Sequence, residues 1–365
     1  MVVNDFFTKS GVNMFSKRMK NLVPYVPGEQ PQDRTYIKLN TNENPYPPSP
    51  AIDNLLKSFP LDRLRLYPDP MFTTLRQTIA DQFGLTPDQV FVGNGSDEVL
   101  AFSFYAFFDS DRGPLLFPEF TYSFYPVYCD LLDIEYAKVP LLPDYGVDLQ
   151  AFINDRVSCG VIFPNPNAPT GMVTALDDIR SFLDAYSKDR TVVVDEAYID
   201  FGGESCVSLI DDYDNLVVVR TLSKSMALAG IRIGYAMGNP SLIKALFTVK
   251  DSFNSYPANM LSQEIARLAF TDVDYFNEVV ARVVSTRKRV SEKMIGMGWE
   301  VLPSSANFVF ARKQGVAGKE IYLRLKERGI LVRHFNIQGI DDFVRITIGT
   351  DEDMTTLLTE INRCF

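Results

Sequence analysis

The middle of the chain, from about residue 89 to residue 236, alternates short apolar runs with stretches of helical character. Most of these runs are apolar at every position, which is typical of strands that helices cover on both faces. The pattern therefore predicts a mostly parallel sheet in an α/β layer. Its strands are expected at QVFVG, PLLFP, CGVIFP, TVVVD, NLVVV and RIGYAM.

The segments on either side of this block have other patterns. Helices are expected at residues 49–59 and 72–83. A long helical stretch at residues 274–298 leads into mixed strand and helix patterns, which indicate a compact α+β unit. The proline-containing N-terminus predicts a short helix followed by an extended arm. We therefore expect an N-terminal arm at residues 1–34 that packs with the small domain, a large domain at 35–265 and a small domain at 266–365.

Composition and charge narrow the class of protein. Of the 365 residues, 46% are hydrophobic and 22% are charged, as in ordinary globular proteins. The formal net charge of −10 argues against a nucleic acid as the main partner, because phosphate backbones require a basic surface. No apolar run approaches the length of a membrane span, and residues 1–30 lack the apolar segment of a signal peptide. We expect a cytoplasmic protein that does not bind membranes.

Cysteine and histidine are too sparse for several kinds of site. The four cysteines lack C-x-x-C spacing, which favours isolated thiols over a disulfide framework or a zinc site. The single histidine, His334, is the one residue around which a Ser-His-Asp triad would have to be built. Chemistry based on a lysine or on carboxylates is therefore favoured, and no metal is expected.

Lys224 follows an apolar run at residues 216–219 that predicts a buried strand, and Arg232 comes eight positions after the lysine. An ammonium group is costly to desolvate at such a place unless it is paired. A desolvated lysine loses its proton readily and can form an imine with an aldehyde, which is how enzymes hold pyridoxal phosphate. Taken alone, Lys224 is better explained as a side chain that extends to the surface.

Two further motifs follow strand ends. In GNGSDEVL, residues 93–100, glycines, Ser96 and the start of a helix offer donors to an anion, although a simple helix cap would explain the same residues. In FPEFTYSFY, residues 117–125, Tyr122 is a candidate to stack on a flat cofactor, whereas its neighbours are better explained by core packing. Each motif is weak by itself.

Two more strand ends carry an amide and a carboxylate. The proline-rich turn FPNPNAPTG fixes Asn167, either as one oriented amide in a site or as part of a structural turn. Asp195 ends a wholly apolar strand, where a protonated pyridine nitrogen would be a suitable partner and an arginine or a helix end would be alternatives. Tyr198 could donate to the 3-hydroxyl of the same ring. In this order, the groups are those that a pyridoxal phosphate site requires.

At these residues the chain resembles the fold-type-I pyridoxal-phosphate aminotransferases, and within them the histidinol-phosphate aminotransferases. The motifs SKSMALAGIRIGY, DEAYIDF, NPNAPTG, GNGSDE, LNTNENPYPP and VRITIGT match that family in order. The resemblance implies an α/β large domain with a mostly parallel, seven-stranded sheet and a smaller α+β C-terminal domain. It also implies a homodimer with shared active sites.

The resemblance also implies a role for single residues. Lys224 would be the Schiff-base lysine and proton carrier, Asp195 would pair with the pyridine nitrogen, and Tyr198 with Asn167 would contact the ring oxygen. Many relatives read N-N-P-T-G where this chain has Ala168 before the proline, so the amide contact falls to Asn167. The remaining residues implied are Tyr122 stacked on the ring, Gly95, Ser96, Asp97, Ser223 and Arg232 around the phosphate, Tyr67 lent across the dimer interface, and Asn94, Arg333 and Arg345 at the substrate.

The expected reaction is a reversible ping-pong transamination between histidinol phosphate and 2-oxoglutarate, which gives imidazole acetol phosphate and glutamate. Arg345 would hold the phosphate of the first substrate and a carboxylate of glutamate. An aromatic-amino-acid aminotransferase and a threonine-phosphate decarboxylase of the same fold remain alternatives. A ligand-sensing regulator that binds DNA is disfavoured by the acidic composition and by the roughly 34 residues before the first family motif.

Overall fold

The computed structural model describes residues 16, 19, 22–154 and 157–365. Its larger part is built on a seven-stranded sheet with the strand order β2-β8-β7-β6-β5-β3-β4. Strand β8 runs antiparallel to both of its neighbours, and the other neighbouring pairs are parallel. The strands are β2 (Val90–Gly93), β3 (Leu115–Pro118), β4 (Tyr136–Val139), β5 (Gly160–Pro164), β6 (Thr191–Asp195), β7 (Leu216–Thr221) and β8 (Gly234–Gly238). The predicted mostly parallel α/β sheet is confirmed.

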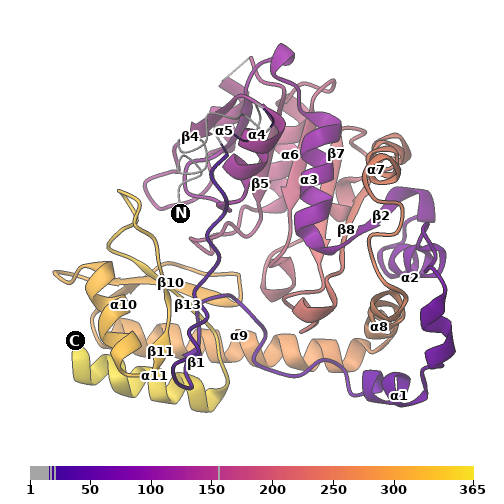
Figure 1. The fold of residues 1–365 in the computed structure, drawn as a ribbon. Coiled ribbons are helices and arrows are strands. Elements are labelled where there is room, and N and C mark those ends of the chain that lie inside the picture. The colour runs from indigo at the N-terminus through magenta and orange to yellow at the C-terminus, as the bar shows by residue number, and fades with distance from the viewer. Residues whose placement is uncertain (1–15, 17–18, 20–21, 155–156) are drawn as a thin grey trace, which may run out of the picture.

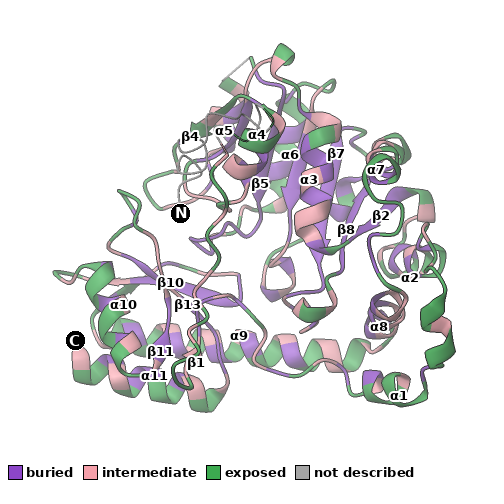
Figure 2. Cartoon of the chain, in the orientation of Figure 1, coloured by how far each residue is buried: buried purple, intermediate pink, exposed green. Residues whose placement is uncertain are grey.

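Helices lie on both sides of this sheet and bury its central strands (Figures 1 and 2). Every residue of β5 and β7 is buried, which accounts for their uninterrupted apolar sequences. The helices of the large domain are α1 (Ala51–Ser58), α2 (Thr73–Phe83), α3 (Gly95–Phe107), α4 (Tyr125–Leu132), α5 (Leu149–Asn154), α6 (Leu176–Ala185), α7 (Pro240–Phe253) and α8 (Met260–Thr271).

A smaller unit follows along the chain and has its own hydrophobic core. A four-stranded antiparallel sheet of order β12-β13-β10-β9 is packed against helices, with the long helix α9 running beneath the two parts of the molecule in Figure 1. The elements are α9 (Val273–Gly296), β9 (Trp299–Val301), β10 (Phe308–Lys313), α10 (Gly318–Glu327), β11 (Ile330–Leu331), β12 (Arg333–His334), β13 (Val344–Thr347) and α11 (Asp351–Cys364). This is the α+β unit expected from the sequence.

The two cores suggest where the domains divide. Ala266 and Phe270 of α8 belong to the core of the large sheet, whereas Val279 and Val283 of α9 belong to the smaller core. Strand β1 (Ile37–Lys38) pairs with β11 of the small domain. We therefore propose a boundary between α8 and α9, a few residues later than the expected division at residue 265, and we assign β1 to the small domain.

The described part of the N-terminal arm contacts α10. Glu29 forms an ion pair with Lys326 and accepts a hydrogen bond of 2.5 Å from the Tyr322 hydroxyl group. Arg34 donates to the backbone oxygen of Lys326 over 2.5 Å. Residues 22–34 form no helix, and the rest of the segment in which a short helix was predicted lies largely outside the described residues. These contacts support the expected packing of the arm against the small domain.

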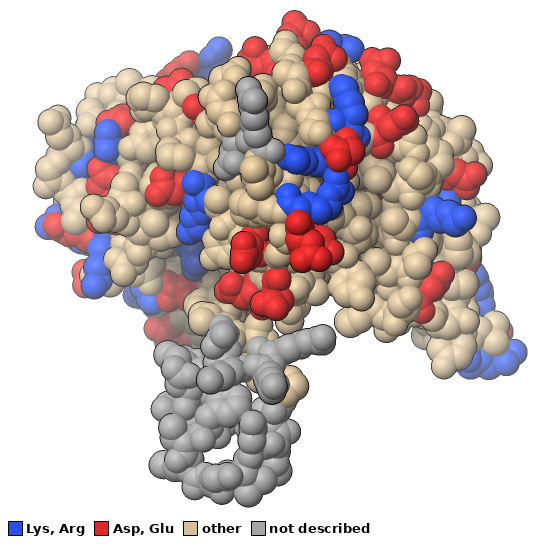
Figure 3. Space-filling view, turned by 90° about the horizontal axis from the view of Figure 1, so that it is seen from above, with Lys and Arg blue, Asp and Glu red and all other residues tan. Residues whose placement is uncertain are grey.

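Charged side chains of both signs are interspersed on the face shown in Figure 3. Within the part of the chain that the structure describes, no helix combines the length and apolar character that a membrane crossing requires. The four cysteines are free, and Cys129, Cys159 and Cys206 are buried.

Candidate active site

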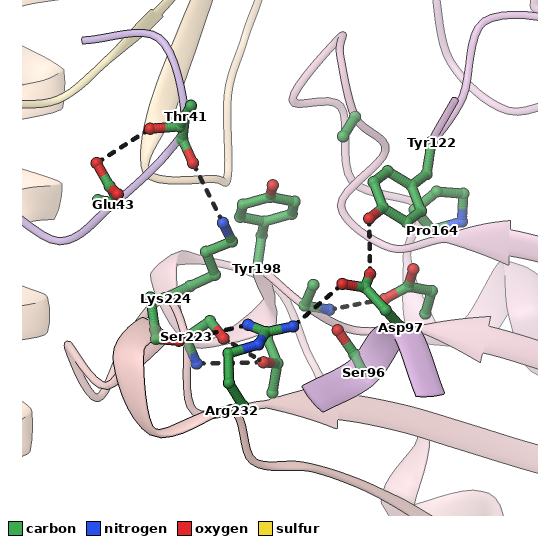
Figure 4. Close-up of a pocket in the computed structure, with 15 residues that line it drawn as sticks. Thr41, Glu43, Ser96, Asp97, Tyr122, Pro164, Tyr198, Ser223, Lys224 and Arg232 are labelled. Carbon is green, nitrogen blue, oxygen red and sulfur yellow. Dashed lines mark hydrogen bonds and ion pairs between the residues drawn. The ribbon is translucent and has the colours of Figure 1, made fainter. Parts of the chain in front are cut away.

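A cavity lies at the carboxyl ends of β5, β6 and β7, where ligands collect in open α/β sheets. Its inner part has a volume of about 190 Å³, and an outer part of about 500 Å³ extends toward the small domain. The two parts share Thr41, Asp97, Tyr122, Ala168, Tyr198, Lys224 and Arg232. Figure 4 shows how the side chains of the inner part face one another.

One end of the inner cavity is suited to an anion. Helix α3 begins here at Gly95, so that its unpaired backbone N–H groups and its positive dipole end lie beside Arg232. The approach is very close, because a Cβ atom at Gly95 would lie 2.5 Å from Nη2 of Arg232. A Cβ atom at Gly234 would lie 2.3 Å from the backbone nitrogen of Ser96. Glycine at both positions therefore lets Arg232 and the start of α3 lie close together, and we call these groups the α3 cradle.

Asp97 organises this end with its side chain. Its Oδ1 accepts a hydrogen bond of 2.8 Å from the Tyr122 hydroxyl group, and its Oδ2 lies 3.1 Å from Nη2 of Arg232. A carboxylate would repel a bound phosphate, so we assign the anion contact to the backbone of Asp97. Burial raises the pKa of Tyr122 well above its usual range, and the nearby charge of Asp97 adds to this effect. Tyr122 therefore remains a neutral donor.

Asp195 also lines the inner cavity and is 5% exposed. It accepts hydrogen bonds from the Tyr125 hydroxyl group at 2.9 Å and from the backbone N–H of Ala197 at 3.2 Å. Burial raises the pKa of this carboxyl group to about 6, although both hydrogen bonds act in the other direction. A buried carboxylate of this kind is stabilised by a cationic partner, such as a protonated ring nitrogen.

Lys224 extends from its loop toward Thr41, with the ring of Tyr198 beside it (Figure 4). Its Nζ donates to the backbone oxygen of Thr41 over 3.3 Å and lies 5.8 Å from the centre of the Tyr198 ring. The side-chain amide of Asn44 donates to the backbone oxygens of Lys224 and Ser225 at 2.9 and 3.2 Å. The loop is therefore fixed from the N-terminal segment, while the amine is directed into the cavity.

Residues of the large domain also fix the loop that carries Lys224. The Ser225 hydroxyl group donates to Oδ2 of Asp200 over 2.5 Å, and Asp200 is paired with the buried Arg220. The Thr221 hydroxyl group donates to Oγ of Ser223 over 3.0 Å, and both residues line the inner cavity.

These residues fit pyridoxal phosphate. The cradle at α3 suits its phosphate, Asp195 its ring nitrogen, and Lys224 its aldehyde carbon. The amide oxygen of Asn167 is buried and has no hydrogen-bond partner among the described residues. A buried acceptor without a partner is costly in the free protein, and a bound group that donates to it would satisfy it.

Comparisons with known proteins agree with this geometry. Residues 34–361 match the family described as aminotransferase class I and II. The chain belongs to the class I and II aminotransferases. A histidinol-phosphate aminotransferase of Syntrophus aciditrophicus is 58% identical, over 97% of this chain and 99% of the relative, and one of Clostridium acetobutylicum is 50% identical, over 96% and 98%. The crystal structure of histidinol-phosphate aminotransferase from Sinorhizobium meliloti in complex with pyridoxal-5'-phosphate superposes with a TM-score of 0.87 at 24% identity, covering 97% of this chain and 98% of that one.

The aminotransferase fold brings most of the predicted residues together. Ser96, Asp97, Tyr122, Asp195, Tyr198, Ser223, Lys224 and Arg232 line the inner cavity, with Gly95 directly beneath Arg232. Asn167 is buried behind the wall, where its amide nitrogen donates to the backbone oxygen of Phe120 at 2.9 Å and to the Thr170 hydroxyl group at 3.1 Å. Its predicted contact with the ring oxygen stays a prediction.

Two predicted residues lie apart from the cavity in this chain. Asn94 is exposed before α3 and its backbone N–H donates to the carboxylate of Glu98 over 2.7 Å. Tyr67 is 80% exposed and stacks on Tyr256, with ring centres 4.6 Å apart. The predicted roles of Asn94 at the substrate and of Tyr67 across a dimer interface remain predictions.

Arg333 and Arg345 face each other on neighbouring strands and line the outer cavity. Arg345 lies between the rings of Phe308 and Phe335, and one of its Nη atoms donates to the backbone oxygen of Asn40 over 3.2 Å. Its Nε is buried without a partner among the described residues. Burial lowers the pKa of Arg345, and the charge of Arg333 adds to this effect. Two adjacent guanidinium groups with a free donor are suited to binding an anion.

Sequence reasoning missed residues that act on these groups. Thr41, Asn42 and Asn44 belong to the segment LNTNENPYPP, which matches a family motif but for which the sequence predicts no role of a single residue. Three asparagines within five residues were the available signal, because such side chains bind backbone groups in loops. Tyr125, which holds Asp195, stands among several aromatic residues and gave no distinguishing signal. No group of three potential metal-binding side chains occurs among the described residues.

Proposed function

We propose that this aminotransferase uses pyridoxal phosphate to interconvert histidinol phosphate and imidazole acetol phosphate, with glutamate and 2-oxoglutarate as the second pair. One observation supports the proposal: cationic side chains lie at two places in the cavity, Arg232 beside the start of α3 and Arg333 with Arg345 in the outer part. Lys224 lines both parts of the cavity. One site suits the phosphate of the cofactor and the other the phosphate of the substrate.

The cofactor, when bound, supplies an aldehyde that receives the amino group and a ring that withdraws electrons from the reacting carbon. Lys224 would hold the aldehyde carbon between turnovers and, once released, would move the proton of the substrate carbon. Asp195 would keep the ring nitrogen protonated, because its buried carboxylate is stabilised by that charge. Tyr198 and Asn167 would hold the ring oxygen, and Tyr122 would cover the ring.

The outer site would serve both substrates. Arg345 and Arg333 can hold the phosphate of histidinol phosphate, and the same guanidinium groups can hold a carboxylate of glutamate in the second half of the reaction. The relatives at 58% and 50% identity, both histidinol-phosphate aminotransferases, support this substrate over an aromatic amino acid or threonine phosphate. A ligand-sensing regulator is disfavoured because the relatives that match nearly the full length of the chain are aminotransferases and because Lys224 and Asp195 line one cavity.

Assembly and location belong to the same proposal. Apolar side chains are exposed in the segment before α2 and near the end of α7, and the two segments meet where Tyr67 stacks on Tyr256; the exposed residues include Leu61, Leu64, Tyr67, Phe253 and Tyr256. Such a surface is suited to a second copy of the chain, and we propose a homodimer in which Tyr67 reaches the partner's cavity. We also propose a cytoplasmic location, which is supported by the free cysteines.

Substitutions at Arg345 test the outer anion site. We expect Arg345→Gln to lower kcat/KM for histidinol phosphate by roughly 100-fold or more, since charged hydrogen bonds worth about 3 kcal/mol are lost. Arg345→Lys keeps the charge but not the planar fork, so we expect a smaller loss, of about 10-fold. The visible absorbance of the bound cofactor should be unchanged in both. An unchanged kcat/KM in Arg345→Gln would contradict the proposal.

A further inference from the structure

Asn42 connects the cavity to the small domain. It is 1% exposed, and its side-chain Nδ2 donates a hydrogen bond of 2.9 Å to the hydroxyl oxygen of Tyr198, 156 positions later in the chain. The backbone oxygen of Asn42 accepts a hydrogen bond of 3.0 Å from the amide of Asn307. Its φ of 55° lies in the left-handed region, which asparagine tolerates better than most residues. The local backbone is therefore fixed around this one amide.

Thr347 of β13 determines which way the Asn42 amide points. The Thr347 hydroxyl group accepts from the backbone N–H of Asn42 and donates to Oδ1 of Asn42, each over 3.0 Å. Because Oδ1 is taken by this donor, Nδ2 must face Tyr198. The same strand carries Arg345, two positions before Thr347.

This arrangement sets the direction of the Tyr198 proton. An amide nitrogen can only donate, so the hydroxyl oxygen of Tyr198 acts as acceptor toward Asn42 and its own proton points elsewhere. The ring is held edge-on to Phe308, with centres 5.2 Å apart and an interplanar angle of 88°. Tyr198 lines the inner cavity, so its O–H group can donate to a ligand there.

We propose that Asn42 is a positioning residue for Tyr198, and that Thr347 holds Asn42 in the orientation this requires. The chain Thr347–Asn42–Tyr198 would then link the strand that carries the substrate-binding Arg345 to the hydroxyl group that contacts the cofactor. The inference rests on the proposed role of Tyr198 toward the ring oxygen of pyridoxal phosphate.

The pH titration of the visible absorbance of the holoenzyme tests this link. A hydrogen-bond donor to the ring oxygen stabilises the deprotonated form of the lysine-bound cofactor. Loss of this hydrogen bond therefore raises the pH at the midpoint of the titration. We expect Thr347→Val to raise the midpoint by roughly 0.5–1 pH unit, as the weakening of one hydrogen bond implies. Thr347→Ser keeps the hydroxyl group and should restore the wild-type midpoint.

Asn42→Asp provides a second, nearly isosteric variant. The new carboxylate would accept the Tyr198 proton and turn it away from the cavity, so we expect a rise at least as large as that in Tyr198→Phe. In the Tyr198→Phe background, Thr347→Val should cause no further rise, because the two substitutions break one chain of hydrogen bonds.

Two results would overturn the inference. One is an unchanged midpoint in Thr347→Val and Asn42→Asp holoenzymes, and the other is an equal rise from Thr347→Val with and without the Tyr198 hydroxyl group, which would indicate a merely structural role. If Asn42→Asp does not fold, the comparison of Thr347→Val with Thr347→Ser decides alone. A wild-type protein with no visible band would overturn the proposed function, and this inference with it.

Discussion

Replacing Asp195 with asparagine tests how much the buried negative charge of this residue lowers the stability of the cofactor-free protein. Asp195 is 5% exposed, and burial raises the pKa of its carboxyl group from 3.8 to about 6. The protein without cofactor therefore carries, at neutral pH, a carboxylate that the fold disfavours. Asparagine has nearly the same shape without the charge and can keep hydrogen bonds to Tyr125 and Ala197.

The size of the effect follows from the two pKa values. A rise of about 2 units corresponds to roughly 3 kcal/mol, since one unit is worth about 1.4 kcal/mol. The folded protein binds this proton more tightly than the unfolded chain does. The cost is therefore absent below a pH of about 4, grows as the pH rises to about 6 and is complete above that value.

Urea unfolding measures the free-energy cost of this buried carboxylate. The cofactor-free wild type and Asp195→Asn are compared by circular dichroism between about pH 4 and pH 8. We expect the variant to be more stable at neutral pH by up to about 3 kcal/mol, with the difference disappearing toward pH 4. Pyridoxal phosphate should reverse the order, because its protonated nitrogen compensates the wild-type carboxylate. A cofactor-free variant that is less stable at neutral pH, or a difference independent of pH, would refute this reasoning.

Two further substitutions test the supports of the site. Tyr125→Phe removes a hydrogen bond to the Asp195 carboxylate, so we expect the pKa of Asp195 in the cofactor-free protein to rise further by about 1 unit. The pH range over which the buried carboxylate costs stability in urea unfolding should move upward by the same amount, and an unmoved range would contradict this. Gly234→Ala places a Cβ atom 2.3 Å from the backbone nitrogen of Ser96, so the start of α3 must shift. We expect fluorescence titration to show pyridoxal phosphate bound at least about 10-fold more weakly, and thermal unfolding to show a loss of about 2 kcal/mol of stability. Wild-type affinity in that variant would show that the α3 cradle does not hold the phosphate.

The strands show what the sequence could and could not predict. Central strands such as β5 and β7 are buried on both faces, and their apolar runs were recognised. The edge strand β4 was not predicted because Tyr136 and Lys138 are exposed and because Lys138 interrupts its apolar residues. The antiparallel direction of β8 depends on its pairing with β2 and β7, which no local pattern encodes.

Some features of the site could also be predicted from the sequence, and others could not. Asp195 ends one apolar strand and Lys224 lies shortly after another, so their unusual positions could be predicted from the sequence. The hydrogen bond from Asn42 to Tyr198 joins residues 156 positions apart and depends on how the N-terminal segment crosses the small domain. Tyr67 is exposed in the single chain, and its expected role in the cavity of a partner needs a second copy of the chain.

The most direct test of the central claim is a half-reaction on the purified protein without 2-oxoglutarate. The visible absorbance of the bound cofactor is followed while histidinol phosphate or phenylalanine is added. We expect histidinol phosphate to convert the absorbance rapidly to that of the aminated cofactor, phenylalanine to do so only slowly, and Lys224→Ala to show neither rapid change. Fast conversion by phenylalanine alone would keep the fold and the cofactor but contradict histidinol phosphate as the substrate.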